Sequence, residues 1–204
     1  MLKIKGLKIF SQDNIIIDVK ELSIQAGETV AFVGKNNTGK TLLLKSMKYL
    51  YRNFDGEIFL KKNDIRDTEN SNIIFIEPKE QLIPEHSLWK NITMVFPKIS
   101  KRTKKKLEKM LKSLSLEEKV DTKVNILSSS EKKMVEIVRS VLQLPYLILI
   151  DDMDKYFDRE QLVKVVDIFR FALSSGTSII VSSKERFPFF DKNYRINKGK
   201  IFQI

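Results

Sequence analysis

In residues 34–41 the chain reads Gly34-Lys35-Asn36-Asn37-Thr38-Gly39-Lys40-Thr41. This segment matches the phosphate-binding pattern G-x-x-x-x-G-K-[ST] at every fixed position. Its glycines let the backbone curl so that successive N–H groups face phosphate oxygens. The apolar run 29–33 precedes it, and apolar residues at helical spacing follow it, namely Leu42, Leu43, Leu44, Met47 and Leu50. The order strand, glycine loop, helix predicts a nucleotide-phosphate site of the P-loop NTPase kind.

Each part of this loop has an expected role toward ATP and its magnesium ion. Lys40 is expected to reach the β- and γ-phosphates, and the Thr41 hydroxyl to ligate Mg²⁺. The helix that starts near Gly39 adds the positive end of its dipole. We therefore expect all residues from Gly34 to Thr41, together with Leu42 of the first helical turn, to bind ATP.

A magnesium-bound phosphate also needs a carboxylate at the end of a neighbouring strand. Asp151 and Asp152 follow the apolar run Leu147–Ile150 directly. Asp151 is expected to serve the metal and Asp152 the attacking water. The other interpretation is that both aspartates are ordinary helix-capping or turn residues.

Hydrophobic periodicity predicts an α/β fold. Residues 2–10 and 14–25 alternate apolar and polar residues, which indicates paired strands. Continuous apolar runs indicate strands buried on both faces, at 29–33, 73–76, 147–150 and 177–181. Helical spacing appears at 101–114, 130–142 and 162–173, and a closing hairpin is expected at 194–204. Strands that alternate with helices predict a mostly parallel sheet covered on both faces.

Composition limits the classes of protein that fit. The chain has 204 residues, 42% of them hydrophobic, and no cysteine, so it has no disulfide framework or thiolate metal site. No eighteen consecutive apolar residues occur, and the N-terminus lacks the apolar core of a signal peptide. A cytosolic location is the simplest expectation. The net charge of +11 is spread along the chain apart from a basic run at 98–112. We interpret it as a solvated lysine-rich surface and expect no nucleic-acid partner.

A second motif precedes the Asp151 strand. Residues 127–142 read LSSSEKKMVEIVRSVL. This segment resembles the signature of ABC (ATP-binding cassette) proteins, L-S-G-G-E-Q-Q-R-V-A-I-A-R-A-L, with matches at Leu127, Ser128, Glu131, Val135, Ile137 and Arg139. A GTPase would instead need Asn-Lys-x-Asp, and the nearest string, at 197–200, lacks the aspartate.

The resemblance extends over nearly the whole chain. It implies an ABC-type ATPase domain spanning 1–204, with an antiparallel lead-in at 3–33 and a small helical subdomain at about 79–142. It places Phe10 near the aromatic residue that stacks on adenine and Asp158 at the D-loop aspartate. Residues 83–95 and 159–160 look most like the branch that serves cell division (FtsE-type) and lipoprotein release (LolD-type).

Four functional motifs depart from the family pattern. Glu77 stands at the Q-loop glutamine, and Ser129 and Ser130 replace the two signature glycines. Asp152 replaces the glutamate that polarises water, and Ser183 replaces the switch histidine. The resemblance gives Glu77 a metal and catalytic role, and Asp152 and Ser183 catalytic roles. Because removing one transition-state donor typically costs about 10²–10³ in kcat, we expect Mg-ATP binding with slow or impaired hydrolysis.

The resemblance implies an ATP-binding subunit that works with a transmembrane partner on the inner face of the cell membrane. Two such domains, identical or different, would close head to tail, with Ser128, Ser129, Ser130 and Glu131 facing the partner's ATP. The alternative is a hydrolysis-deficient nucleotide-gated scaffold, a silent half of a heterodimer, or an ATP-binding role in cell division. A DNA-associated ABC ATPase would need long coiled-coil heptads or a second cassette, and the sequence has neither.

Overall fold

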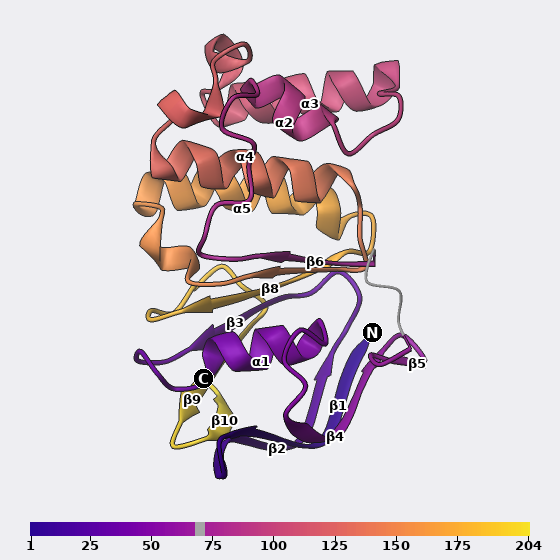
Figure 1. Cartoon of the computed structure of the whole chain (residues 1–204), viewed down its shortest axis with the longest axis vertical. Coiled ribbons are helices and arrows are strands. Elements are labelled where there is room, and N and C mark those ends of the chain that lie inside the picture. The colour runs from indigo at the N-terminus through magenta and orange to yellow at the C-terminus, as the bar shows by residue number, and fades with distance from the viewer. Residues whose placement is uncertain (68–71) are drawn as a thin grey trace.

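The computed structural model describes residues 1–67 and 72–204, which form the layers seen in Figure 1. The strands are β1 (Leu2–Ser11), β2 (Asn14–Ile24), β3 (Thr29–Val33), β4 (Phe54–Leu60), β5 (Asn63–Asp64), β6 (Ile73–Ile76), β7 (Leu147–Ile150), β8 (Ser178–Ser183), β9 (Lys192–Asn197) and β10 (Lys200–Gln203). The α-helices are α1 (Lys40–Met47), α2 (Leu88–Thr93), α3 (Lys101–Ser113), α4 (Ser129–Leu142) and α5 (Arg159–Leu173). Short 3₁₀ helices are η2 (Glu117–Lys119), η3 (Val124–Ile126) and η4 (Met153–Lys155).

The central sheet has the strand order β10-β9-β3-β8-β7-β6. All of its neighbouring strands run parallel except β10, which pairs antiparallel with β9. Strands β3, β7 and β8 are buried along their whole length, as their continuous apolar runs predict. The prediction of a mostly parallel α/β sheet is confirmed. Because parallel strands end at one edge, the residues that follow β3, β7 and β8 meet there.

A second, antiparallel sheet has the order β2-β1-β4-β5 and lies with α1 on one face of the central sheet (Figure 1). The predicted pairing of β1 with β2 is confirmed, with Leu2 opposite Ile24. Strand β4 was not predicted, because Asp55-Gly56 looks like a turn. Gly56 has a φ of 94°, and a Cβ there would lie 2.4 Å from the carbonyl oxygen of Gly6. A glycine is therefore what lets β4 pair closely with β1.

Helices α2 to α5 lie on the opposite face of the central sheet (Figure 1). The three predicted longer helices are confirmed, and α3 begins after Ser100, whose hydroxyl accepts from the Thr103 N–H at 3.1 Å. Helix α3 buries Leu107, Met110 and Leu111 and leaves most of its lysines exposed. Among the described residues, no helix has the length and apolar composition needed to cross a bilayer.

The helix after the phosphate loop is shorter than its apolar spacing predicts. Helix α1 ends at Met47, and Tyr49 has a left-handed φ of 58°. The Tyr49 N–H donates to the Ser46 carbonyl at 2.9 Å, which closes the last turn. Leu50 lies outside the helix and is 53% exposed, so its assignment to the buried helical stripe was wrong.

Candidate functional site

The loop between β3 and α1 needs both of its glycines. Gly39 has a φ of 93°, and a Cβ there would lie 2.8 Å from Cγ2 of Ile16. A Cβ on Gly34 would lie 3.0 Å from the carbonyl oxygen of Ile196. The Gly34 N–H donates to the Ser183 carbonyl at 3.1 Å, which ties the loop to the end of β8. Side chains at Gly34 and Gly39 would therefore push the loop away from β9 and β2, while the hydrogen bond to Ser183 attaches it to β8.

Lys40 lies across this loop. Its Nζ donates to the carbonyl oxygens of Gly34 at 2.7 Å and Lys35 at 2.9 Å. Burial lowers the pKa of Lys40, and the nearby carboxylates of Asp152 and Asp151 oppose that shift. The ammonium group is held at the curl of the loop, where phosphate oxygens would be its natural further acceptors.

Thr41 and Asp151 meet at the base of the loop. The Thr41 hydroxyl donates to Oδ2 of Asp151 at 2.8 Å, and the Ser182 hydroxyl donates to Oδ1. Asp151 is only 1% exposed. The described residues contain no group of three or more His, Cys, Asp or Glu side chains that could hold a metal alone. Mg²⁺ usually takes one or two protein ligands plus phosphates and water, so Thr41 and Asp151 suit a nucleotide-bound magnesium.

Asp152 adopts a left-handed backbone with φ 49° and ψ 48°. Its N–H donates to the Ser182 hydroxyl at 2.8 Å, and its side chain makes no capping hydrogen bond to η4. Burial and the negative charge of Asp151 raise the pKa of Asp152. Asp152 therefore does not cap η4, and its carboxylate is available to a ligand.

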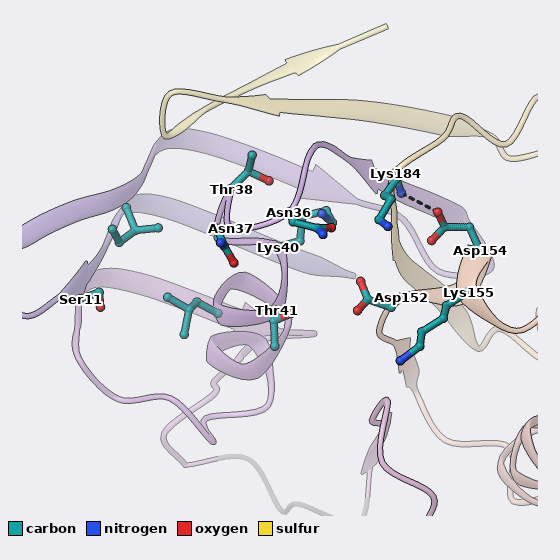
Figure 2. A pocket seen from close by; sticks show the side chains of 13 residues that line it. Ser11, Asn36, Asn37, Thr38, Lys40, Thr41, Asp152, Asp154, Lys155 and Lys184 are labelled. Atoms are coloured by element: carbon teal, nitrogen blue, oxygen red, sulfur yellow. Dashed lines mark hydrogen bonds between the residues drawn. The ribbon is translucent and has the colours of Figure 1, made fainter. Parts of the chain in front are cut away.

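These residues line a cavity of about 680 Å³, a size typical of small-molecule sites (Figure 2). The predicted residues on its wall are Asn36, Asn37, Thr38, Gly39, Lys40, Thr41, Leu42 and Asp152. Sequence reasoning missed the others, which are Ser11, Ile16, Asp154, Lys155 and Lys184. These five belong to no short motif. Asp154, Lys155 and Lys184 do lie within five residues of a strand end at the loop's edge of the sheet, which is the one signal that could have found them.

Phe10 is not among the residues that line the cavity. Its backbone N–H donates to the Asn53 carbonyl at 3.0 Å, and its carbonyl accepts from the Tyr51 hydroxyl. Ser11, its neighbour in sequence, and the partly buried Ile16 do line the cavity. An adenine contact for Phe10 stays a prediction, and Ile16 offers an apolar surface where the sequence suggested an aromatic one.

Glu77 and Ser183 also lie off the cavity wall. Glu77 lines a separate groove of about 590 Å³, where Oε2 accepts from Nε2 of Gln81 at 3.1 Å. The ammonium of Lys45 lies 3.8 Å from Oε1 of Glu77. Ser183 is fully buried and its hydroxyl donates to the Glu185 carbonyl. Their proposed catalytic and metal roles would require these side chains to move.

The signature segment forms the N-terminus of α4. The Ser128 hydroxyl accepts from the Glu131 N–H at 3.3 Å, and the Glu131 carboxylate accepts from the Ser128 N–H at 2.8 Å. This is a capping box, which the spacing Ser-x-x-Glu could have predicted. Ser128 and Ser129 are exposed, and Ser130 is partly buried. None of the three serines lines the cavity of its own chain, and their contact with ATP held by a second chain stays a prediction.

Asp158 has a similar structural role at the start of α5. Its carboxylate accepts from the Gln161 N–H at 2.8 Å, and the Gln161 side chain accepts from the Asp158 N–H at 3.2 Å. Asp158 is exposed and does not line the cavity. Its D-loop role toward a second chain stays a prediction beside this local one.

A buried ion pair joins α4 to the segment after β6. Nζ of Lys133 lies 2.6 Å from Oε2 of Glu136, with the side chains 0% and 2% exposed. Lys133 also donates to the Glu77 carbonyl at 2.7 Å, and Glu136 accepts from the Gln81 N–H. Tyr156 closes the cluster, since its hydroxyl donates to the Pro78 carbonyl at 2.7 Å. No sequence prediction included this pair, because charged residues on an amphipathic helix usually face solvent.

Comparison with known sequences places this geometry in context. A family model described as "ABC transporter" matches residues 17–155. The chain is 27% identical over 203 residues to the ribose import ATP-binding protein RbsA of Caldanaerobacter subterraneus, covering 94% of this chain but only 41% of that protein. It is also 27% identical over 197 residues to the lipoprotein-releasing system ATP-binding protein LolD of Aquifex aeolicus, covering 91% and 88%. It thus spans less than half of the ribose import protein and most of the lipoprotein-releasing one.

Solved structures share the fold at low identity. The ATP-binding subunit of an ABC transporter superposes with a TM-score of 0.84 at 20% identity, covering 98% of this chain and 88% of that one. A putative ABC transporter ATP-binding protein from Pyrococcus furiosus gives 0.84 at 23% identity, covering 96% of each chain. A dimeric ATP-binding cassette bound to ADP and Pi gives 0.80 at 21% identity, covering 98% and 96%.

Proposed function

The chain belongs to the ABC transporter family of ATP-binding proteins, and on that premise we propose that it is the nucleotide-binding subunit of a membrane ABC complex. The observation that carries the proposal is the convergence of Lys40, Thr41 and Asp151 on the wall and base of one cavity. These three groups are the ones that a P-loop NTPase uses for the β- and γ-phosphates and the metal. All three keep their usual residue types here, although the positions that serve hydrolysis vary.

The residues of this chain would divide the work of binding. The N–H groups of the curled loop and the Lys40 ammonium would hold the terminal phosphates. Thr41 would offer its hydroxyl to the metal while Asp151 orients that hydroxyl through the bond at 2.8 Å. Bound Mg²⁺ supplies neutralisation of the phosphate charge. Ile16, on the same wall, would pack against the apolar part of the nucleotide.

Exposed residues outside the cavity support two partners, a second ATP-binding domain and a transmembrane protein. Ser128 and Ser129 are exposed at the start of α4 and are suited to face the cavity of a second, identical or different, ATP-binding domain. The relative with ADP and Pi that shares this fold is a dimer, which supports that arrangement. A transmembrane partner would bind between Glu77 and Ser128, where the groove includes the exposed Val95. That assembly would place the chain in the cytoplasm, peripheral on the inner face of the membrane.

Hydrolysis in this account is slow. Asp152 has a carboxylate one methylene shorter than the glutamate of the family pattern, and misplacement of a catalytic group by about 1 Å can cost about 10²-fold in rate. Glu77 and Ser183 point to partners outside the cavity. The second candidate function, a hydrolysis-deficient scaffold or silent half of a heterodimer, is favoured by those same two placements. A partner chain with complete residues could still make one composite site active.

The test compares ATP affinity with turnover on the purified chain, alone and with its membrane partner. Titration with Mg-ATP should give saturable one-site binding, which Lys40→Ala should weaken more than tenfold. Single-turnover hydrolysis should run at least about 100-fold below the ~10 s⁻¹ that is typical of enzymes. Turnover near the typical value would refute slow hydrolysis alone. Failure of the folded chain to bind nucleotide would refute the function itself.

A further inference from the structure

We propose that Lys184, the first residue after β8, binds the terminal phosphate of the nucleotide and makes the site select the triphosphate over the diphosphate. The proposal rests on the proposed ATP-binding function and adds a specificity-determining residue to it. Lys184 lines the same cavity as Lys40 and Thr41, although it lies outside the phosphate loop and its motif (Figure 2).

The backbone at Lys184 is fixed on both sides. On one side, the Ser183 carbonyl accepts from the Gly34 N–H at 3.1 Å, so the end of β8 is attached to the phosphate loop. On the other, the Lys184 N–H donates to Oδ2 of Asp154 at 3.0 Å. The Ser183 hydroxyl donates to the Glu185 carbonyl, so this side chain does not face the cavity. The chain therefore presents Lys184, and not Ser183, to the ligand.

The Lys184 ammonium is free to meet an anion. The neighbouring carboxylate of Asp154 accepts a hydrogen bond from the backbone N–H of Lys184, not from its ammonium group. Within residues 1–67 and 72–204, no carboxylate forms an ion pair with the Lys184 side chain. Lys184 is exposed, so its long side chain can follow a ligand into the cavity. Lys155, also on the wall, has its ammonium 5.7 Å from the centre of the Tyr156 ring.

Charge on the wall supports the choice of phosphate as the ligand. Lys40 and Lys184 place two positively charged side chains on the wall of the same cavity. Two like charges that converge on one space are stabilised when an anion lies between them. Each phosphate group of a nucleotide supplies such an anion, and the triphosphate supplies the most charge.

The position of Lys184 favours the terminal phosphate over the inner ones. Thr41 and Asp151 mark the place of the metal, which in P-loop proteins bridges the β- and γ-oxygens. Figure 2 shows Lys184 near Asp152, Asp154 and Lys155, on the side of the cavity that faces Thr41. A nucleotide that ends at the β-phosphate would leave this side of the wall without a contact. Loss of Lys184 should then cost affinity for the triphosphate and little for the diphosphate.

The experiment is isothermal titration calorimetry of the full chain with Mg-AMP-PNP and Mg-ADP. The variants are Lys184→Ala, Lys184→Arg and, as a matched control, Lys105→Ala, an exposed lysine on α3 far from the cavity wall. For Lys184→Ala we expect about a 5- to 20-fold weaker Kd for AMP-PNP, typical of a partly exposed charge-assisted contact, and less than twofold for ADP. Lys184→Arg should keep most of the triphosphate preference, and Lys105→Ala should behave as the unaltered protein.

Three results would overturn the inference. The first is a Lys184→Ala variant whose Kd values equal those of the unaltered chain, which would make Lys184 a solvated surface lysine. The second is an equal loss for both nucleotides, which would mean a general electrostatic effect without selection. The third is an unaltered chain that binds neither nucleotide, which would refute the proposed function along with this inference. Thermal melts of each variant establish that it is folded, since an exposed side chain should leave Tm unchanged.

Discussion

The hydroxyl of Thr41 lies 2.8 Å from Oδ2 of Asp151, although 110 positions separate the two residues in sequence. Thr41 is in the first turn of α1, and Asp151 follows β7 directly. The second carboxylate oxygen of Asp151 accepts from Ser182 at the end of β8. Three elements thus fix one carboxylate, and the Thr41 hydroxyl, which is predicted to bind the metal, is already oriented without a ligand.

Asp151→Asn should weaken the magnesium-dependent part of nucleotide binding. The amide keeps the size of the side chain but removes the negative charge, and loss of such a supporting group typically costs about 10- to 100-fold in metal affinity. Titration with ATP in magnesium and again in EDTA measures this, and the EDTA affinity should stay the same. Asp55→Asn, an exposed carboxylate on β4, is the control. Equal losses with and without magnesium would contradict a metal role for Asp151.

Asp152→Asn should stabilise the ligand-free chain at neutral pH. Burial and the charge of Asp151 raise the pKa of Asp152 above its ordinary value of 3.8, so the folded state binds the proton more tightly than the unfolded state. The carboxylate therefore destabilises the fold above its folded pKa, and this penalty disappears as the pH falls toward 3.8. Tm should rise by a small amount, on the order of 1–2 °C after solvent screening.

The measurement for Asp152 is a series of thermal melts of both chains between about pH 7.5 and pH 4.5. The gap in Tm should be widest at the neutral end and narrow steadily toward the acid end. An Asn variant that melts lower at neutral pH, or a gap that widens in acid, would show that the Asp152 charge is stabilising after all.

Lys133→Met should destabilise the fold by about 3–5 kcal/mol, because it leaves the Glu136 carboxylate buried without its cation. The double variant Lys133→Met with Glu136→Leu should recover most of that loss, since neither charge then remains. Some loss should persist, because the Gln81 N–H also gives up its acceptor. Urea unfolding of the single and double variants gives these free energies.

An exposed ion pair on α5 provides the control for the buried one. Lys164 and Glu160 are 2.9 Å apart, with side chains 35% and 80% exposed. Lys164→Met should change the free energy of unfolding by less than about 0.5 kcal/mol. If Lys133→Met costs no more than Lys164→Met, the Lys133–Glu136 pair does not hold α4 to the segment after β6.

The sequence predicted those features that depend on short contiguous patterns. The loop from Gly34 to Thr41 is recognisable because its glycines and its flanking strand and helix are all local. The buried strands β3, β7 and β8 were predicted because continuous apolar runs of that length fit strands covered on both faces. Because these parallel strands end at the same edge of the sheet, their order alone was enough to predict that Asp151 lies near Thr41.

The sequence could not predict features that depend on distant backbone. Strand β4 pairs with β1 only because Gly56 meets Gly6 across the sheet, and Asp55-Gly56 reads locally as a turn. Lys184 lines the cavity because the end of β8 lies beside the loop that follows β3, and these two strands are far apart in sequence. Glu136 is buried because its partner, Lys133, is one helical turn away and the Gln81 backbone covers it. In each case the partner is set by tertiary packing, which hydrophobic periodicity does not report.

The most direct test of the account is calorimetric titration of Mg-AMP-PNP into the folded chain and into Lys40→Ala. The Lys40 ammonium donates to the carbonyls of Gly34 and Lys35 at the curl of the loop, where the nucleotide phosphates are predicted to bind. The account predicts saturable binding at one site per chain, weakened more than tenfold in Lys40→Ala while Lys105→Ala binds normally. A folded, unaltered chain that takes up no magnesium nucleotide would contradict the account.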